Sequence, residues 1–96
     1  MKMFRQGDLL FLEIDKIPNY AAEVPTKVIL RGEATGHSHR LENGQLLRYG
    51  SQMYIKAQPQ TKIVHEEHAT INLEIGFWMV VRQREYSPWK ITNVMD

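Results

Sequence analysis

The sequence predicts an all-β protein, in the form of a compact small barrel, jelly roll or sandwich of about eight short strands. Turn-forming glycines, prolines and asparagines recur roughly every ten residues, and the segments between them are short and rich in β-branched and aromatic side chains. No window shows a sustained period of about 3.6 residues, which an amphipathic helix would require. At 96 residues the chain is long enough for a single domain, over residues 1–96, and too short for two.

The first third of the chain contains two predicted strands. Residues Leu9–Ile14 form an apolar run that is too short for a helix and that is followed by the turn signal Ile17-Pro18-Asn19. Residues Thr26–Arg31 are rich in β-branched side chains and stop at Gly32, which is typical of a second strand. Between them, the segment Ala21-Ala22-Glu23 is compatible with one helical turn.

A tight hairpin is predicted around Asn43-Gly44. Asparagine and glycine both tolerate the positive φ that two-residue hairpin turns require, and here they lie between Leu41 and the apolar pair Leu46-Leu47. Gly36 interrupts the chain just before His37. The segment from His37 to Leu41 is therefore expected to form the first arm of this hairpin.

The third quarter of the chain is predicted to form three short strands. Gln52–Lys56 and Thr61–His65 are extended runs separated by a turn at Pro59. Residues Ala69–Ile75 alternate apolar with polar side chains, which indicates a half-buried strand.

Two further strands are expected towards the C-terminal end. Gly76 precedes the run Phe77–Tyr86, whose first half is continuously apolar and whose second half alternates in charge. Ser87-Pro88 ends this run, and Trp89–Val94 supplies a last short strand. Three aromatic side chains are expected to fill the core: Phe11, Phe77 and Trp78.

The composition argues against several classes of function. Twelve basic and eleven acidic residues give a formal net charge of +1, so a nucleic-acid partner, which usually requires a strongly basic chain, is not favoured. No apolar run reaches the roughly 20 residues that cross a bilayer, and the N-terminal segment lacks the pattern of a secretory signal. We therefore expect a cytoplasmic protein without membrane contact. The absence of cysteine excludes disulfides, thiolate metal ligands and thiol nucleophiles.

All four histidines fall into two close pairs, which are His37 with His39 and His65 with His68. Alternate residues of a strand share a face, so the first pair would project from one face of the sheet. The second pair has a spacing of three and can share a face only where the backbone forms a turn or a bulge. The intervening Glu66-Glu67 favours such a turn, because glutamates are poor strand formers.

Two histidine pairs that face one pocket would form a transition-metal site with the ligands His37, His39, His65 and His68. Neutral imidazoles suit zinc, nickel, iron or copper better than magnesium or calcium. Three histidines and an open position would activate a bound water, whereas four closed ligands would serve structure or storage. Glu42 and Glu67 are the carboxylates expected to act as oxygen ligands or as acid/base groups. The pattern leaves open which metal is bound and whether the protein is an enzyme.

Two other functions are compatible with the same residues. A metal-independent enzyme acting on a phosphodiester or nucleotide could use two histidines as general acid and base, because an ordinary histidine pKa is about 6.5. Arg40, Arg82 and Arg84 would then bind the anionic group, with the last two on one strand face. A non-catalytic protein-binding module would instead have histidines that are incidental or that sense pH. A homo-oligomer is a further expectation, since two subunits could each supply one pair to a shared ion.

Two resemblances add to these patterns. The segment Gly36–Glu42 resembles a shortened first cupin motif, which implies a double-stranded β-helix with His37, His39 and Glu42 as metal ligands. Four segments together resemble a family of small, uncharacterised bacterial and phage-associated proteins of about this length; they are Gln6-Gly7-Asp8, Gly32–His39, His65–His68 and Gln83–Tyr86. This second resemblance implies that the segments act as one unit, and it implies no reaction.

Overall fold

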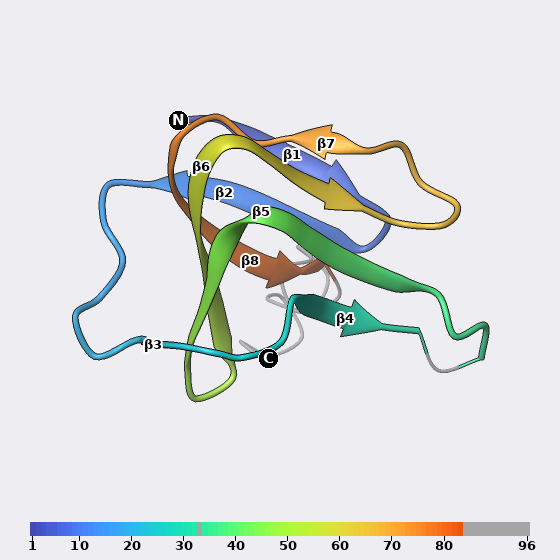
Figure 1. Ribbon diagram of the computed structural model, residues 1–96, viewed down its shortest axis with the longest axis horizontal. Coiled ribbons are helices and arrows are strands. Elements are labelled where there is room, and N and C mark those ends of the chain that lie inside the picture. Colours follow the sequence, from blue (N-terminus) through green and yellow to red (C-terminus); the bar gives the residue numbers. More distant parts are fainter. Residues whose placement is uncertain (33, 84–96) are drawn as a thin grey trace, which may run out of the picture.

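The computed structural model describes residues 1–32 and 34–83, and β-strands are the main secondary structure of this part of the chain (Figure 1). Its eight strands are β1 (Met3–Gln6), β2 (Leu9–Ile14), β3 (Ala22–Glu23), β4 (Val28–Arg31), β5 (Ser38–Tyr49), β6 (Gln52–Val64), β7 (Ile71–Asn72) and β8 (Gly76–Arg82). They form one antiparallel sheet with the order β1-β2-β8-β6-β5-β3, in which β4 also pairs with β5 and β7 with β6. The all-β prediction is confirmed. Within these residues the sheet is not closed into a barrel, and no helix has the length and apolar character to cross a membrane.

The long hairpin of β5 and β6 organises the sheet. The two strands pair from the turn, where Tyr49 faces Gln52, to the far end, where Arg40 faces Val64, and their register shifts midway. Near the turn, β8 pairs with β6 and β3 pairs with β5. Beyond the register shift, β7 pairs with β6 and β4 pairs with β5. The irregularity therefore divides the hairpin into two halves that have different neighbours, as Figure 1 shows.

The predicted hairpin at Asn43-Gly44 is wrong. Asn43 does have a positive φ of 58°, but it lies inside β5, where it forms part of the bulge that shifts the register. The hairpin turn is Gly50-Ser51 instead. Gly50 has φ 60° and occupies the first of the two loop positions, which is where a type II′ turn uses glycine. The left-handed preference of asparagine is thus used by a bulge rather than by a turn.

The predicted turn at Pro59 is also a bulge, and β6 continues through it as a single strand. Gln60 has φ 65°. The buried hydroxyl of Thr61 donates to the carbonyl of Asn43 and accepts from the backbone N–H of Gln58 at 2.7 Å. Pro59 is tolerated here because a bulge leaves some backbone N–H groups out of the ladder.

Other predicted elements differ at their ends. The strand Thr26–Arg31 is confirmed as the shorter β4, and the front half of Phe77–Tyr86 as β8. Ala22–Glu23 is a short strand rather than a helical turn, because it pairs with β5. The expected strand Ala69–Ile75 shrinks to β7, and Ile75 is 69% exposed. The strand expected at Trp89–Val94 lies outside the described residues.

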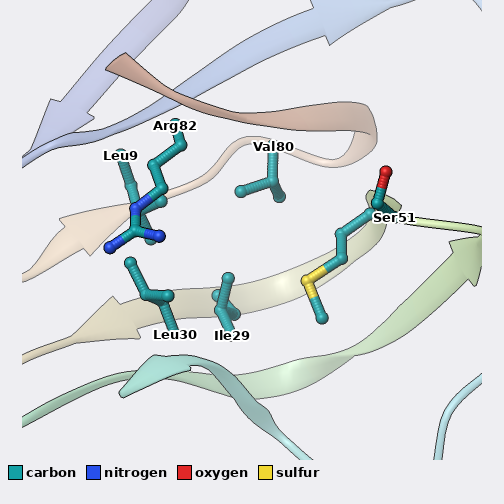
Figure 2. A pocket seen from close by; sticks show the side chains of 7 residues that line it. Leu9, Ile29, Leu30, Ser51, Val80 and Arg82 are labelled. Atoms are coloured by element: carbon teal, nitrogen blue, oxygen red, sulfur yellow. The ribbon is translucent and has the colours of Figure 1, made fainter. Parts of the chain in front are cut away.

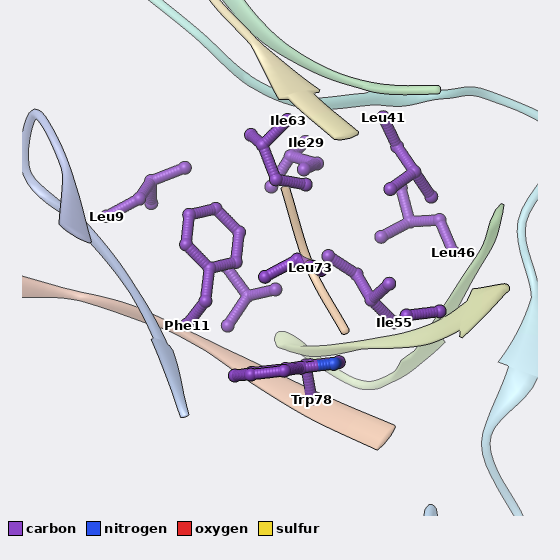
Figure 3. Packing of buried hydrophobic residues seen from close by; sticks show 11 residues of the cluster. Leu9, Phe11, Ile29, Leu41, Leu46, Ile55, Ile63, Leu73 and Trp78 are labelled. Atoms are coloured by element: carbon purple, nitrogen blue, oxygen red, sulfur yellow. The ribbon is translucent and has the colours of Figure 1, made fainter. Parts of the chain in front are cut away.

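The core lies between strands from both halves of the long hairpin. Its largest fully buried apolar side chains are Trp78, Phe11, Leu46, Ile55 and Ile63, which come from β8, β2, β5 and β6 (Figure 3). The indole N–H of Trp78 donates to the carbonyl of Glu74 at 3.0 Å, so that its burial leaves no donor unpaired. Phe77, also expected in the core, is only half buried.

Candidate metal centre

One pocket of about 240 Å³ lies where the β1–β2 turn, the β4–β5 loop and the β6–β7 loop approach the end of β8. These three connections lie on the same side of the molecule, at the right in Figure 1. The pocket is lined by Gly7, Asp8, Leu30, Arg31, Gly32, Thr35, His37, His39, His65, Glu67, His68 and Arg82. The fold therefore brings both histidine pairs to one cavity.

The four imidazole rings form one continuous cluster. Ring centroids are 4.4 Å apart for His39 and His65, and 4.6 Å apart for His65 and His68. His37 meets His65 edge-on at 5.7 Å, and His39 and His68 are nearly parallel at 6.0 Å. Two imidazoles that bind one tetrahedral ion through nitrogens about 2.0–2.1 Å away have centroids roughly 5 Å apart. The observed separations bracket this value, so the rings are close enough to share an ion.

Gln6 fixes the tautomer of His39. The side-chain amide of this buried glutamine donates to the carbonyls of Ile63, at 3.0 Å, and Ala69, at 2.9 Å. Both amide hydrogens are used, so its oxygen must act as the acceptor in the 2.8 Å contact with Nδ1 of His39. Nδ1 of His39 therefore carries the proton, and Nε2 carries the lone pair that a metal ion requires.

His39 is held in the neutral form. Burial lowers its pKa from 6.5 to about 4, and the neighbouring His65 and His68 act in the same direction, while the carboxylates of Asp8 and Glu66 oppose them. Burial disfavours the charged imidazolium, because the pocket replaces bulk water with less polar surroundings. At neutral pH the ring is thus ready to bind a cation without first losing a proton.

His37 has a carboxylate partner at the corresponding ring nitrogen. Its Nδ1 lies 3.1 Å from an oxygen of Glu67, an arrangement that leaves Nε2 available to an ion. The ring of His65 is fixed differently, since its Nδ1 accepts the backbone N–H of Glu67 at 3.0 Å. Neutral His65 therefore carries its proton on Nε2. An ion at that nitrogen would require the other tautomer, with the proton on Nδ1 and the contact with the Glu67 N–H lost.

Glu66 connects the β6–β7 loop, which carries His65, with strand β5. One carboxylate oxygen accepts the backbone N–H of Ser38 at 3.0 Å, and the other accepts the guanidinium of Arg40 at 2.9 Å. These contacts, led by the Ser38 N–H, lower the pKa of Glu66 from 4.5 to about 2. Ligand atoms of His37, His65 and Glu66 lie within 4.8 Å of one another. The other two histidines lie outside this group, so a centre with four imidazoles requires ring rotations.

Gly7 forms the floor beneath His39 and His68. Its φ is 61°, and a Cβ atom at this position would lie 2.9 Å from Nε2 of His68 and 3.3 Å from Cε1 of His39. Glycine is therefore required both by the turn and by the close approach of the rings. The absence of a side chain at Gly7 therefore lets the β1–β2 turn pack directly against the two imidazole rings.

A family model described as a domain of unknown function, DUF8820, matches residues 5–83. The chain belongs to this family. The matched range includes every residue that lines the histidine pocket, and it confirms the resemblance to an uncharacterised family. No curated protein and no solved structure matches the chain.

Not every predicted site residue of this DUF8820 domain reaches the pocket. Glu67 and Arg82 line it. Glu42 is exposed and, two residues along β5 from Arg40, points to the face opposite His39, although the cupin resemblance implies it as a ligand. Arg40 is paired with Glu66 instead. Arg84 lies outside the described residues, and the single open sheet differs from the double-stranded β-helix of the cupins.

Local sequence patterns do not predict three residues of the site. Gln6 supports His39, while Asp8 and Arg31 line the pocket. The segment Gln6-Gly7-Asp8 does carry a signal, since it belongs to the family resemblance. Its role could not be deduced, because it depends on contacts with β5 and the β6–β7 loop.

Proposed function

We propose that the protein binds a transition-metal ion in this pocket, through the imidazoles of His37, His39, His65 and His68. The observation that carries the proposal is the clustering of all four rings around one cavity, with Nδ1 of two of them directed at acceptors. Outer-sphere acceptors of this kind orient metal-binding histidines and raise their basicity.

Zinc is the most suitable probe, and nickel, copper or iron are alternatives. A site built from neutral nitrogen donors binds these ions well, whereas magnesium and calcium prefer oxygen. If only three of the four imidazoles bind the ion, its fourth position would be open to water, whose pKa zinc lowers to about 7. Glu67 lines the pocket, and we assign its carboxylate as the acceptor of a proton from such a water.

His39 is unsuited to the metal-independent alternative. A general acid and base pair near neutrality needs two imidazoles with a pKa close to the working pH. The pKa of His39 is about 4, which makes this ring a weak base and a poor proton carrier at pH 7.

One chain also supplies all four histidines, so a shared ion does not require a homo-oligomer.

Metal analysis and zinc calorimetry on protein purified without a polyhistidine tag test the proposal. We expect about one equivalent of zinc, and at least a tenfold loss of affinity for each of His39→Gln and His68→Gln. Glu66→Gln separates the four-imidazole centre from the group of His37, His65 and Glu66. Glu13→Gln is the matched control, because the half-buried Glu13 carboxylate also accepts a backbone N–H, that of Lys2, and does not line the pocket. Binding far below one equivalent, with unchanged melting temperature, would contradict the proposal.

A further inference from the structure

A second pocket of about 210 Å³ adjoins the histidine pocket (Figure 2). Five of its seven lining side chains are apolar, and they come from β2, β4, β6 and β8: Leu9, Ile29, Leu30, Met53 and Val80. None of the four histidines lines it. It is thus a separate compartment with a different chemistry.

The two pockets share Leu30 and Arg82. Leu30 lies opposite His39 in the pairing of β4 with β5, so the apolar wall continues directly into the histidine site. Figure 2 shows the guanidinium of Arg82 between Leu9 and Leu30, at one end of the apolar pocket. A molecule that filled both compartments would pass this guanidinium.

The charge at this junction selects an anion. Nε of Arg82 lies 3.4 Å from a carboxylate oxygen of Asp8, a long contact, and within residues 1–32 and 34–83 its two Nη groups make no hydrogen bond. A guanidinium presents these groups in a planar fork that matches a carboxylate. Asp8 offsets the charge of Arg82, so a divalent ion held by neutral imidazoles would leave the junction positive.

We propose that the two adjoining pockets together bind an organic anion with an apolar chain. Its carboxylate lies between Arg82 and the histidine-bound ion, and its chain occupies the second pocket. The position of the ion rests on the proposed metal binding. The position of the chain rests on the second pocket alone. The ligand class is therefore a straight-chain carboxylate rather than a free inorganic anion.

Calorimetry of the zinc-loaded protein with acetate, butanoate, hexanoate and octanoate tests this proposal. Affinity should rise about fourfold for each methylene that is buried and level off once the pocket is filled. Hexylammonium, which has the same number of carbon atoms but the opposite charge, should bind much more weakly than hexanoate. Equal affinity for acetate and hexanoate, or for hexanoate and hexylammonium, would overturn the proposal.

Variants separate the two parts of the ligand. Arg82→Gln should lower hexanoate affinity by tenfold or more while the increase with chain length is kept, and the exposed Arg48→Gln should change neither. An unchanged affinity in Arg82→Gln would overturn the assignment of the carboxylate. If zinc fails to bind, the metal centre alone is contradicted. The same series on metal-free protein then decides: a rise with chain length supports the apolar pocket, and a flat series overturns it.

Discussion

Gln6 shows how a single side chain can set the chemistry of the site. Its partners at Ile63 and Ala69 are 57 and 63 residues away in sequence, and His39 is 33 residues away. Its amide donates to strand β6 and to the β6–β7 loop, and its oxygen accepts the Nδ1–H of His39, so that one side chain holds both segments and sets the tautomer of His39. The histidine pairs could be predicted from their spacing, whereas Gln6 could not, since nothing in its neighbourhood in the sequence indicates burial of an amide.

Replacing Gln6 should therefore weaken metal binding. In Gln6→Leu the Nδ1–H of His39 loses its acceptor, and we expect zinc affinity to fall about 10- to 100-fold. Gln52→Leu is the matched control, because Gln52 also donates to two backbone carbonyls, those of Met53 and Val80, but lies away from the histidines. Calorimetry should show a loss for the first variant only. Equal affinities in both variants would show that Gln6 merely supports the fold.

A second residue-scale prediction compares two glycines with the same backbone conformation. Gly7 and Gly50 have φ values of 61° and 60°, so an alanine at either position should cost about 1–2 kcal/mol of unfolding free energy. A Cβ atom at Gly50 meets nothing within 4 Å, whereas at Gly7 it meets His68. Zinc affinity should therefore fall in Gly7→Ala and stay unchanged in Gly50→Ala. Denaturant unfolding and calorimetry on both variants check the two effects separately.

At the scale of elements, the sequence predicts where the chain departs from regular structure better than it predicts the form of that departure. Asn43-Gly44 and Pro59 are both irregular positions, as their residue types indicate. They form bulges because Asn43 lies opposite the bulged segment of β6, and each half of the long hairpin buries apolar residues against different neighbours. Local preference identifies the positive φ, and tertiary packing decides between a turn and a bulge.

The hydroxyl of Thr61 should be the main polar support of this double bulge. Thr61→Val keeps the shape but removes the donor to the Asn43 carbonyl and the acceptor of the Gln58 N–H. Two backbone groups beside a fully buried side chain then lose their partner, which should cost about 2 kcal/mol of unfolding free energy. Thr26→Val is the control, because the Thr26 hydroxyl accepts the Val28 N–H in an exposed contact. Similar denaturation midpoints for the two variants would contradict this role.

At the scale of the whole molecule, the site is a product of the fold rather than of any one segment. Its residues come from the β1–β2 turn, β4 and the loop that follows it, the start of β5, the β6–β7 loop and the end of β8. The sequence supplies the histidines and their spacing. Only the antiparallel order of the strands brings these connections to one side, and that order depends on long-range pairing that local patterns do not encode.

Two groups of this site, His39 and Glu66, should make the free energy of unfolding of the metal-free protein fall as the pH falls. The pKa of His39 falls from 6.5 to about 4 on folding, and that of Glu66 from 4.5 to about 2. In both intervals the unfolded chain binds more protons than the folded one, so the free energy of unfolding must fall as pH falls. His39 contributes at most about 1.4 kcal/mol per pH unit within its interval, and the exposed Glu66 acts in the same direction at lower pH.

Denaturant midpoints measured with a chelator present should therefore decline from about pH 6.5 downwards and continue to decline towards pH 2. His39→Gln removes the first of these groups, and its decline should begin closer to pH 4.5, where protonation of Glu66 starts in the unfolded chain. A wild-type midpoint that is constant between pH 7 and pH 5 would show that His39 does not stay neutral in the folded pocket. That result would also weaken the case for its Nε2 as a ready metal ligand, since a protonated imidazole repels a cation.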